Sequence, residues 1–176
     1  MTTQRMRPLQ RDEMNEAQTH VADALIAGPR GAVRGPFPAL LRRPDLADCA
    51  RAMGDCLRGR SALSVHQKEI IILYVANFWS AHYEWNAHLK IAAQAGLNPE
   101  IPDAIAAGRK PKLDRAEDEI VYDFTAALLS KRDVDDATYD RALVAFGEEG
   151  IIDIVGTIGY FNFVCMVFNA ARITPK

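Results

Sequence analysis

The chain has 176 residues, of which 49% are apolar and 25% charged, and its formal net charge is −2. This balance is typical of a soluble globular domain and argues against nucleic acid or an anionic membrane as a main partner. Residues 1–18 lack the apolar core of a secretory signal, and no apolar run reaches the roughly 20 residues that span a bilayer. Three cysteines are too few for a disulfide scaffold. We therefore expect a cytoplasmic protein without membrane or nucleic-acid partners.

The first third of the chain contains two helical patterns separated by a proline-rich segment. Apolar residues recur at helical spacing over residues 11–27 and again over residues 45–57. Between them, three prolines within residues 36–44 predict an extended or turned segment. That segment is also apolar, so we expect it to lie on the body of the protein.

The remaining segments also predict helices. They cover a long stretch over 64–96, a short helix over 99–107, and further helices over 114–130, 136–147 and about 150–171. No segment shows the alternation of a strand. The sequence therefore predicts an all-α, single-domain bundle of about seven helices, without a sheet.

The stretch over 64–96 has the clearest boundaries and the most unusual polar residues. Ser64 and Gln67 have the spacing of a capping box, and Gly96 suits the left-handed turn that ends a helix. A break near residues 77–80 would divide the stretch into two helices, but the pattern allows one helix as well.

Three ionisable residues lie among the apolar side chains of this stretch. Glu84 and His88 are four residues apart, so they share one helical face. Glu69 would lie roughly 22 Å from Glu84 on a continuous helix. Contact between Glu69 and His88 therefore requires that the chain folds back, or that a second subunit supplies one of them.

If the three side chains meet, they can move a proton on a carbon acid without a cofactor. A carboxylate beside an imidazole raises its pKa and fixes one tautomer, and a second carboxylate can act as an acid. The alternative is an ordinary surface Glu–His pair, which spacing alone favours. A metal site is disfavoured, because the di-iron pattern needs Glu-x-x-His on two helices. We predict neither metal nor cofactor.

Several aromatic residues are candidates for a substrate pocket. They are Phe37 in the proline-rich segment, Tyr83 and Trp85 beside Glu84, and Tyr160 in the apolar C-terminal helix. Pockets are lined by such rings. Packing in the core explains Phe37 and Trp85 equally well, and a bond from Tyr160 to a neighbouring helix would satisfy its hydroxyl.

Glu69, then Ala81-x-x-Glu84-x-x-x-His88, then Gly96 resembles the central motif of the carboxymuconolactone decarboxylase superfamily, which includes the alkylhydroperoxidase D-like proteins. The resemblance covers roughly residues 33–175, so we divide the chain into an N-terminal tail and helical extension (1–32) and a helical domain (33–176). It implies a central antiparallel helix pair. It also implies a homo-trimer or homo-hexamer with the site near a subunit interface.

The resemblance also bears on activity. In the hydroperoxidase branch the positions of Ala81 and Glu84 are cysteines, so thiol peroxidase activity is disfavoured here. The other branch implies a cofactor-independent decarboxylase or isomerase, acting on a small carboxylated or lactone product of aromatic degradation. His88 would then donate the proton or polarise the substrate, with Glu69 and Glu84 as its acid–base partners. The alternative is a non-catalytic oligomer of the same fold.

Overall fold

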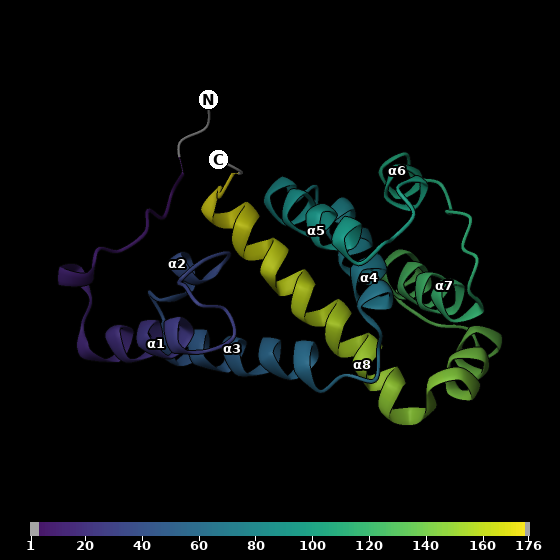
Figure 1. Ribbon diagram of the computed structural model, residues 1–176, viewed down its shortest axis with the longest axis horizontal. Helices are drawn as coiled ribbons and strands as arrows, with labels where there is room; N and C mark the ends of the chain where they lie inside the picture. The colour runs from purple at the N-terminus through teal and green to yellow at the C-terminus, as the bar shows by residue number, and fades with distance from the viewer. Residues whose placement is uncertain (1–3, 175–176) are drawn as a thin grey trace.

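The computed structural model describes residues 4–174, and over that range it contains eight α-helices, a short 3₁₀ turn and no strand (Figure 1). The predicted all-α, single-domain fold is therefore confirmed. The 3₁₀ turn covers Arg11–Glu13, and the helices are α1 (Glu16–Ala27), α2 (Phe37–Leu40), α3 (Pro44–Gly59), α4 (Val65–Phe78), α5 (His82–Gln94), α6 (Glu100–Ala106), α7 (Ala116–Lys131) and α8 (Asp136–Ala171).

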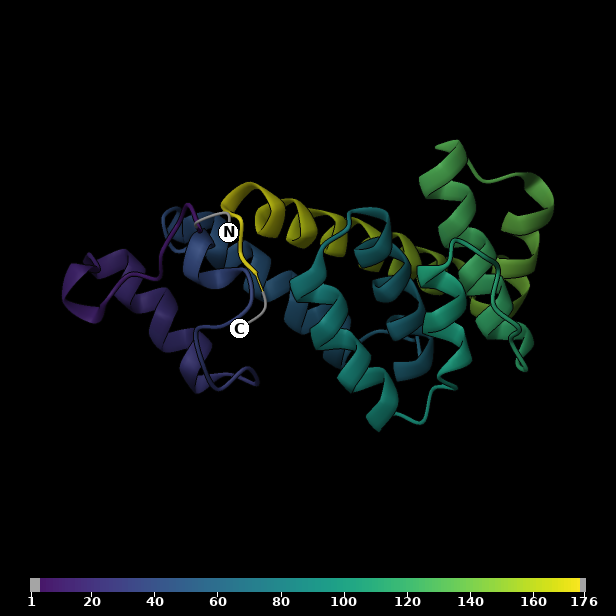
Figure 2. The ribbon, with the colours of Figure 1, turned by 90° about the horizontal axis from the view of Figure 1, so that it is seen from above.

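The long helix α8 runs through the middle of the molecule (Figure 1). Helices α2, α3, α4 and α7 contact α8 directly, and α4 also contacts α5, α6 and α7. Seen from above, α1 lies at one end of the elongated molecule and α7 with the first part of α8 at the other (Figure 2). Helix α4 is thus enclosed by four helices, α5, α6, α7 and α8.

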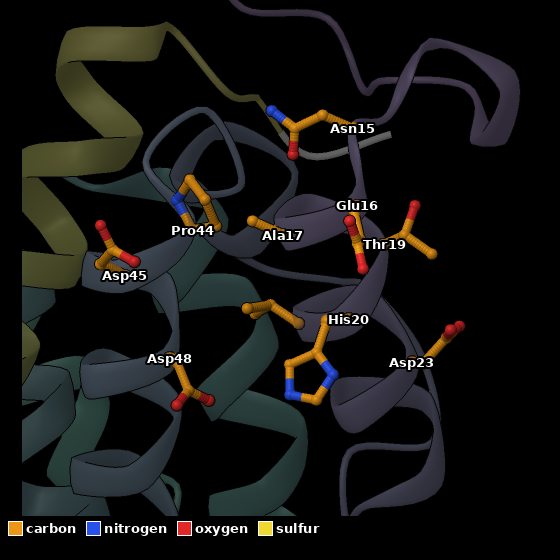
Figure 3. Close-up of a pocket in the computed structure, with 10 residues that line it drawn as sticks. Asn15, Glu16, Ala17, Thr19, His20, Asp23, Pro44, Asp45 and Asp48 are labelled. Atoms are coloured by element: carbon orange, nitrogen blue, oxygen red, sulfur yellow. The ribbon is translucent and has the colours of Figure 1, made fainter.

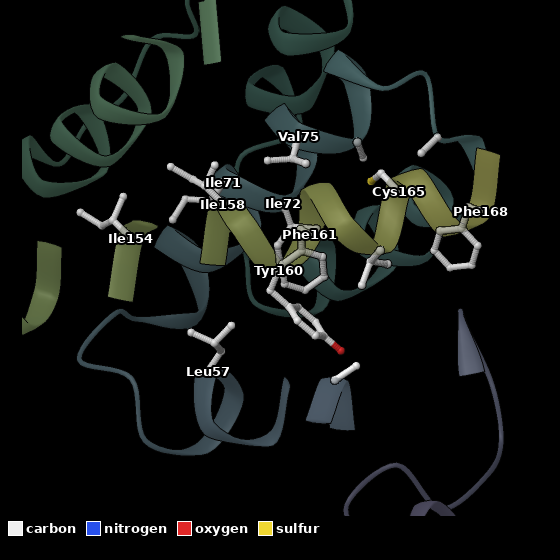
Figure 4. Close-up of a cluster of buried hydrophobic side chains, with 14 of the residues drawn as sticks. Leu57, Ile71, Ile72, Val75, Ile154, Ile158, Tyr160, Phe161, Cys165 and Phe168 are labelled. Atoms are coloured by element: carbon white, nitrogen blue, oxygen red, sulfur yellow. The ribbon is translucent and has the colours of Figure 1, made fainter. Parts of the chain in front are cut away.

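The core lies where α8 meets α3 and α4 (Figure 4). Helix α8 contributes apolar side chains at helical spacing, and Ile154, Ile158, Cys165 and Phe168 are at most 3% exposed. A second, smaller cluster around Leu73 joins α4 to α5, α6 and α7. Burial of these side chains, at roughly 1.5–3 kcal/mol each, holds the helices against one another.

Helices α4 and α5 form the antiparallel pair on which the candidate site is built. The Ser64 hydroxyl accepts a hydrogen bond from the Gln67 backbone N–H, and the Gln67 side chain accepts one from the Ser64 backbone, which confirms the predicted capping box. The break predicted near residues 77–80 is also present. Ser80 has a φ of 49°, so the chain reverses direction there and α5 returns beside α4.

The structure corrects two boundaries and confirms a third. The first helix begins at Glu16 rather than residue 11, because Asn15 caps it. The proline-rich segment contains the four-residue helix α2, since prolines are compatible with a first helical turn. The two helices predicted after residue 135 are both present as segments of α8, because the backbone at Gly147 is non-helical (φ 66°, ψ −178°), which confirms the boundary predicted near residue 147. With α8 counted as one element, the described range has eight helices, against about seven predicted.

Helix α8 is the one helix within residues 4–174 that is long and apolar enough to cross a membrane by composition. Half of its most apolar window is buried against other parts of the chain. The core helix of a globular protein passes the same test, so the observation is weak evidence for a membrane span. Several of its apolar side chains nevertheless face outward, notably Ile152 at 68% exposure.

Candidate active site

The three ionisable residues of the central stretch meet in one cluster within a single chain. The His88 Nδ1–H donates a hydrogen bond to Glu69 Oε2 at 2.8 Å, and His88 Nε2 lies 3.3 Å from Glu84 Oε1. The side chains of Glu69 and Glu84 are 6% and 7% exposed, and that of His88 is 14% exposed. We call these three residues the acid–base cluster.

The helical hairpin explains how Glu69 reaches His88. The two residues lie on opposite sides of the turn after Phe78 and at similar sequence distances from it, so an antiparallel pair sets them side by side. Glu84 lies one helical turn before His88 on α5 and approaches the other ring nitrogen. Of the two routes to contact left open by the sequence, the chain uses the fold-back. The surface-pair alternative is wrong, because both carboxylates are buried.

The cluster strongly favours a protonated imidazole. Burial by itself would lower the pKa of His88, but the contacts with Glu69 and Glu84 outweigh burial and raise the pKa to about 9. At neutral pH the ring is therefore an imidazolium that presents an N–H to each carboxylate. Both ring nitrogens therefore face carboxylate oxygens. No group of three or more metal-ligating side chains in residues 4–174 has the arrangement of a metal site.

Apolar groups of α8 surround the cluster. The Phe161 ring meets the His88 ring edge to face, with 5.3 Å between centroids. Cys165 is fully buried nearby, and burial, with a smaller contribution from Glu84, raises the pKa of its thiol to about 12. Cys165 is consequently not a thiolate at neutral pH. These surroundings strengthen the electrostatic interactions within the cluster, because they exclude water.

The four predicted pocket residues take different places in the core. Phe37 is fully buried, and Tyr160 is 3% exposed. Tyr83 stacks on Phe168 with 4.6 Å between ring centroids, and Trp85 is partly buried between the two apolar clusters. All four rings therefore pack against the core, and their contact with a substrate stays a prediction.

Two residues near the cluster have no signal in the sequence. Arg30 lies in the Gly-Pro-Arg-Gly turn after α1, and its Nη2 donates a hydrogen bond to the Tyr160 hydroxyl at 3.1 Å. Phe161 is one of many apolar residues in α8, and only the helix orientation shows that it covers His88. Loop residues have no periodicity, so a contact across 130 residues of sequence is decided by tertiary packing alone.

Two surface hollows lie away from the acid–base cluster. The first, of about 1000 Å³, lies between α1 and α3 and is lined by polar side chains including Glu16, His20, Asp23 and Asp48 (Figure 3). The second, of about 530 Å³, lies between α7 and the first part of α8. Neither includes Glu69, Glu84 or His88, so these hollows do not define the candidate site.

The fold is that of the alkylhydroperoxidase D-like proteins, which confirms the resemblance drawn from the central motif. The chain is similar to the alkylhydroperoxidase AhpD core of an uncharacterized peroxidase-related protein from Ralstonia eutropha JMP134. The TM-score is 0.79 at 18% sequence identity, and the match covers 100% of this chain and 94% of the other.

Two further solved structures are similar over nearly the whole chain. An uncharacterized peroxidase-related protein from Silicibacter sp. TM1040 has a TM-score of 0.77 and 21% identity, covering 98% of this chain and 92% of the other. The debrominase Bmp8, a cysteine-to-alanine variant in complex with 2,3,4-tribromopyrrole, has a TM-score of 0.71 and 18% identity, covering 95% and 89%. No family model and no curated protein matches the sequence. At these identities the similarity establishes the fold alone.

Proposed function

We propose that this protein is a cofactor-independent lyase or isomerase that moves a proton on a small carboxylated or lactone-containing substrate. The observation that carries this proposal is the buried acid–base cluster, in which one imidazolium lies between two carboxylates. A buried, protonated His88 is a proton donor. The carboxylates orient the ring, and a carboxylate relays a new proton to it after the transfer.

In a decarboxylation, the bond between the substrate carbon and its carboxylate breaks, CO₂ leaves, and the electron pair stays on the substrate as an enolate. The imidazolium of His88 then transfers its proton to carbon. The neutral ring recovers a proton from water through Glu84. In an isomerisation a carboxylate removes the proton from one carbon, and His88 returns a proton to another.

Two further observations support a small ring-derived substrate and acid–base chemistry. A debrominase with the same fold is in complex with a brominated pyrrole, so this fold accommodates small planar rings in at least one protein. The cysteines of this chain are poorly suited to thiol chemistry. Cys165 is buried with a raised pKa, and Cys49 and Cys56 are free and seven residues apart on α3, about 10 Å along the axis.

A second candidate is a non-catalytic oligomer of the same fold. The exposed apolar side chains of Phe78 on α4, Ile91 on α5 and Ile152 on α8 favour it, because exposed apolar groups often mark an interface. Assembly is equally compatible with an enzyme, and we propose that the protein is a homo-trimer or homo-hexamer in the cytoplasm in either case.

The test compares wild type with His88→Gln on a panel of carboxylated muconolactones, following CO₂ release and exchange of carbon-bound hydrogen in D₂O by NMR. We expect turnover in wild type and a loss of at least about a hundredfold in the variant. His82→Gln is the matched control, because His82 is exposed on the same helix. Full activity of His88→Gln would exclude His88, and an inactive wild type would contradict the proposal.

Size-exclusion chromatography of the same variants separates the two candidates. An intact oligomer with lost turnover supports the enzyme. Dissociation of the His88→Gln oligomer, together with no turnover by wild type, supports the assembly role instead.

A further inference from the structure

A group of side chains formed by Arg30, Arg58 and Tyr160, which we call the cationic group, lies next to the acid–base cluster. Arg30, in the turn between α1 and α2, donates a hydrogen bond from Nη2 to the Tyr160 hydroxyl at 3.1 Å. Its Cζ lies 4.4 Å from the centre of the Phe37 ring, so the guanidinium rests on an aromatic face. Phe37 and Tyr160 are both buried, which fixes the position of the guanidinium against the protein body.

The Arg30 guanidinium has no direct carboxylate partner in the described part of the chain, and Asp55 and Glu84 act on its pKa only from a distance. Arg30 forms no ion pair with a carboxylate of residues 4–174, and its buried Nε–H has no hydrogen-bond partner there. Burying a cation and a donor without partners is unfavourable. Burial lowers the pKa of Arg30, and repulsion from Arg58 lowers it further. A bound anion would relieve both penalties.

Arg58 brings a second guanidinium to the same hydroxyl. The Tyr160 hydroxyl points toward α3 (Figure 4), where a Cβ atom on Gly54 would lie 2.5 Å from Tyr160 Oη and 3.0 Å from Arg58 Nη2. Arg58 already donates a hydrogen bond to Asp55 at 2.9 Å. Arg58 thus has a carboxylate partner, whereas Arg30 forms no ion pair with a carboxylate of residues 4–174. Tyr160, which accepts a bond from Arg30, keeps its own proton for a further acceptor.

The cationic group and the acid–base cluster are adjacent. The Phe161 ring contacts both, with its centroid 5.3 Å from that of His88 and 5.2 Å from that of Tyr160. Glu84 is close enough to raise the pKa of Tyr160 and to oppose the lowering of the Arg30 pKa. The two groups are therefore linked through one shared ring, that of Phe161.

We propose that the Arg30 guanidinium and the Tyr160 hydroxyl bind a carboxylate group of a small organic substrate, which makes Arg30 the residue that selects anionic substrates. A planar guanidinium offers parallel N–H donors that match the two oxygens of a carboxylate. The bound carboxylate anchors the substrate while a neighbouring carbon meets the acid–base cluster. This inference rests on the proposed function for the chemistry, but the anion binding itself does not require turnover.

The test measures binding of adipate, a small dicarboxylate, and of its uncharged dimethyl ester by isothermal titration calorimetry. Wild type should bind adipate, with a shift of the Arg30 Nε–H resonance in NMR, and bind the ester at least about tenfold more weakly. Arg30→Gln should lose at least about tenfold in adipate affinity. Arg34→Gln is the matched control, because Arg34 is exposed in the same loop, and it should bind like wild type.

Two results would overturn the proposal. The first is that wild type binds adipate and its ester with equal affinity, and the second is that Arg30→Gln and Arg34→Gln lose adipate affinity to the same extent. If Arg30→Gln does not fold, Tyr160→Phe keeps the ring and its packing and should still weaken adipate binding several-fold. Adipate binding is measured without any reaction. Arginine-dependent binding without turnover of any substrate would therefore refute the proposed function and leave the anion site standing.

Discussion

The raised pKa of His88 links the stability of the fold to pH. The pKa of His88 is about 9 in the folded chain, against 6.5 for an unperturbed imidazole. The folded chain therefore binds this proton more tightly than the unfolded chain, so the stabilisation is complete below pH 6.5 and is lost as the pH rises through 9. At 1.36 kcal/mol per pKa unit, the loss in the free energy of unfolding amounts to about 3 kcal/mol.

Urea unfolding followed by circular dichroism between pH 6 and pH 9 measures this loss. His88→Gln removes the titrating group, so its stability should be lower at pH 6 and should change little over the same range. The difference between wild type and variant isolates His88 from other groups that titrate. The range stops at pH 9 because Cys165, whose thiol pKa is raised to about 12, also destabilises the fold at higher pH.

His82→Gln is the control for the loss of a histidine, since His82 lies exposed on the same helix. Its stability profile should follow that of wild type. Parallel profiles for wild type and His88→Gln would refute the reasoning, because they would mean that His88 has the same proton affinity in the folded and unfolded chain.

Two further predictions concern the same region. Glu69→Gln removes one of the carboxylates that hold the His88 proton, and should lower the pKa of His88 by roughly one unit or more in an NMR titration of the ring; an unchanged pKa would assign the whole effect to Glu84. Gly54→Ala places a Cβ 2.5 Å from the Tyr160 hydroxyl and should cost about 1–3 kcal/mol of stability in urea unfolding, whereas unaltered stability would show that Tyr160 moves freely.

The position of the candidate site has a structural reason. Helix α4 is enclosed by four other helices, so Glu69 is buried although it carries a carboxylate. Such a group is stable in the fold only when it is paired, and His88 on α5 supplies the pair. The anion site proposed at Arg30 has the opposite arrangement, because the half-buried guanidinium forms no ion pair with a carboxylate of residues 4–174.

The sequence by itself determined the helical class and most of the helices of this protein, because these depend on local spacing. The capping box at Ser64, the helix end at Gly96 and the shared face of Glu84 and His88 follow from residues within a few positions of one another. The kink at Gly147 was likewise predicted as a helix end, since glycine there adopts a left-handed conformation.

Only the tertiary structure decided which distant residues meet. Whether Glu69 reaches His88 depended on the turn at Ser80, and the sequence allowed both one helix and two. Arg30 and Tyr160 are 130 residues apart, and no local pattern links a loop arginine to a phenol in α8. Periodicity describes one helix face at a time, whereas burial and charge pairing depend on which faces pack together, and that is set by the whole core.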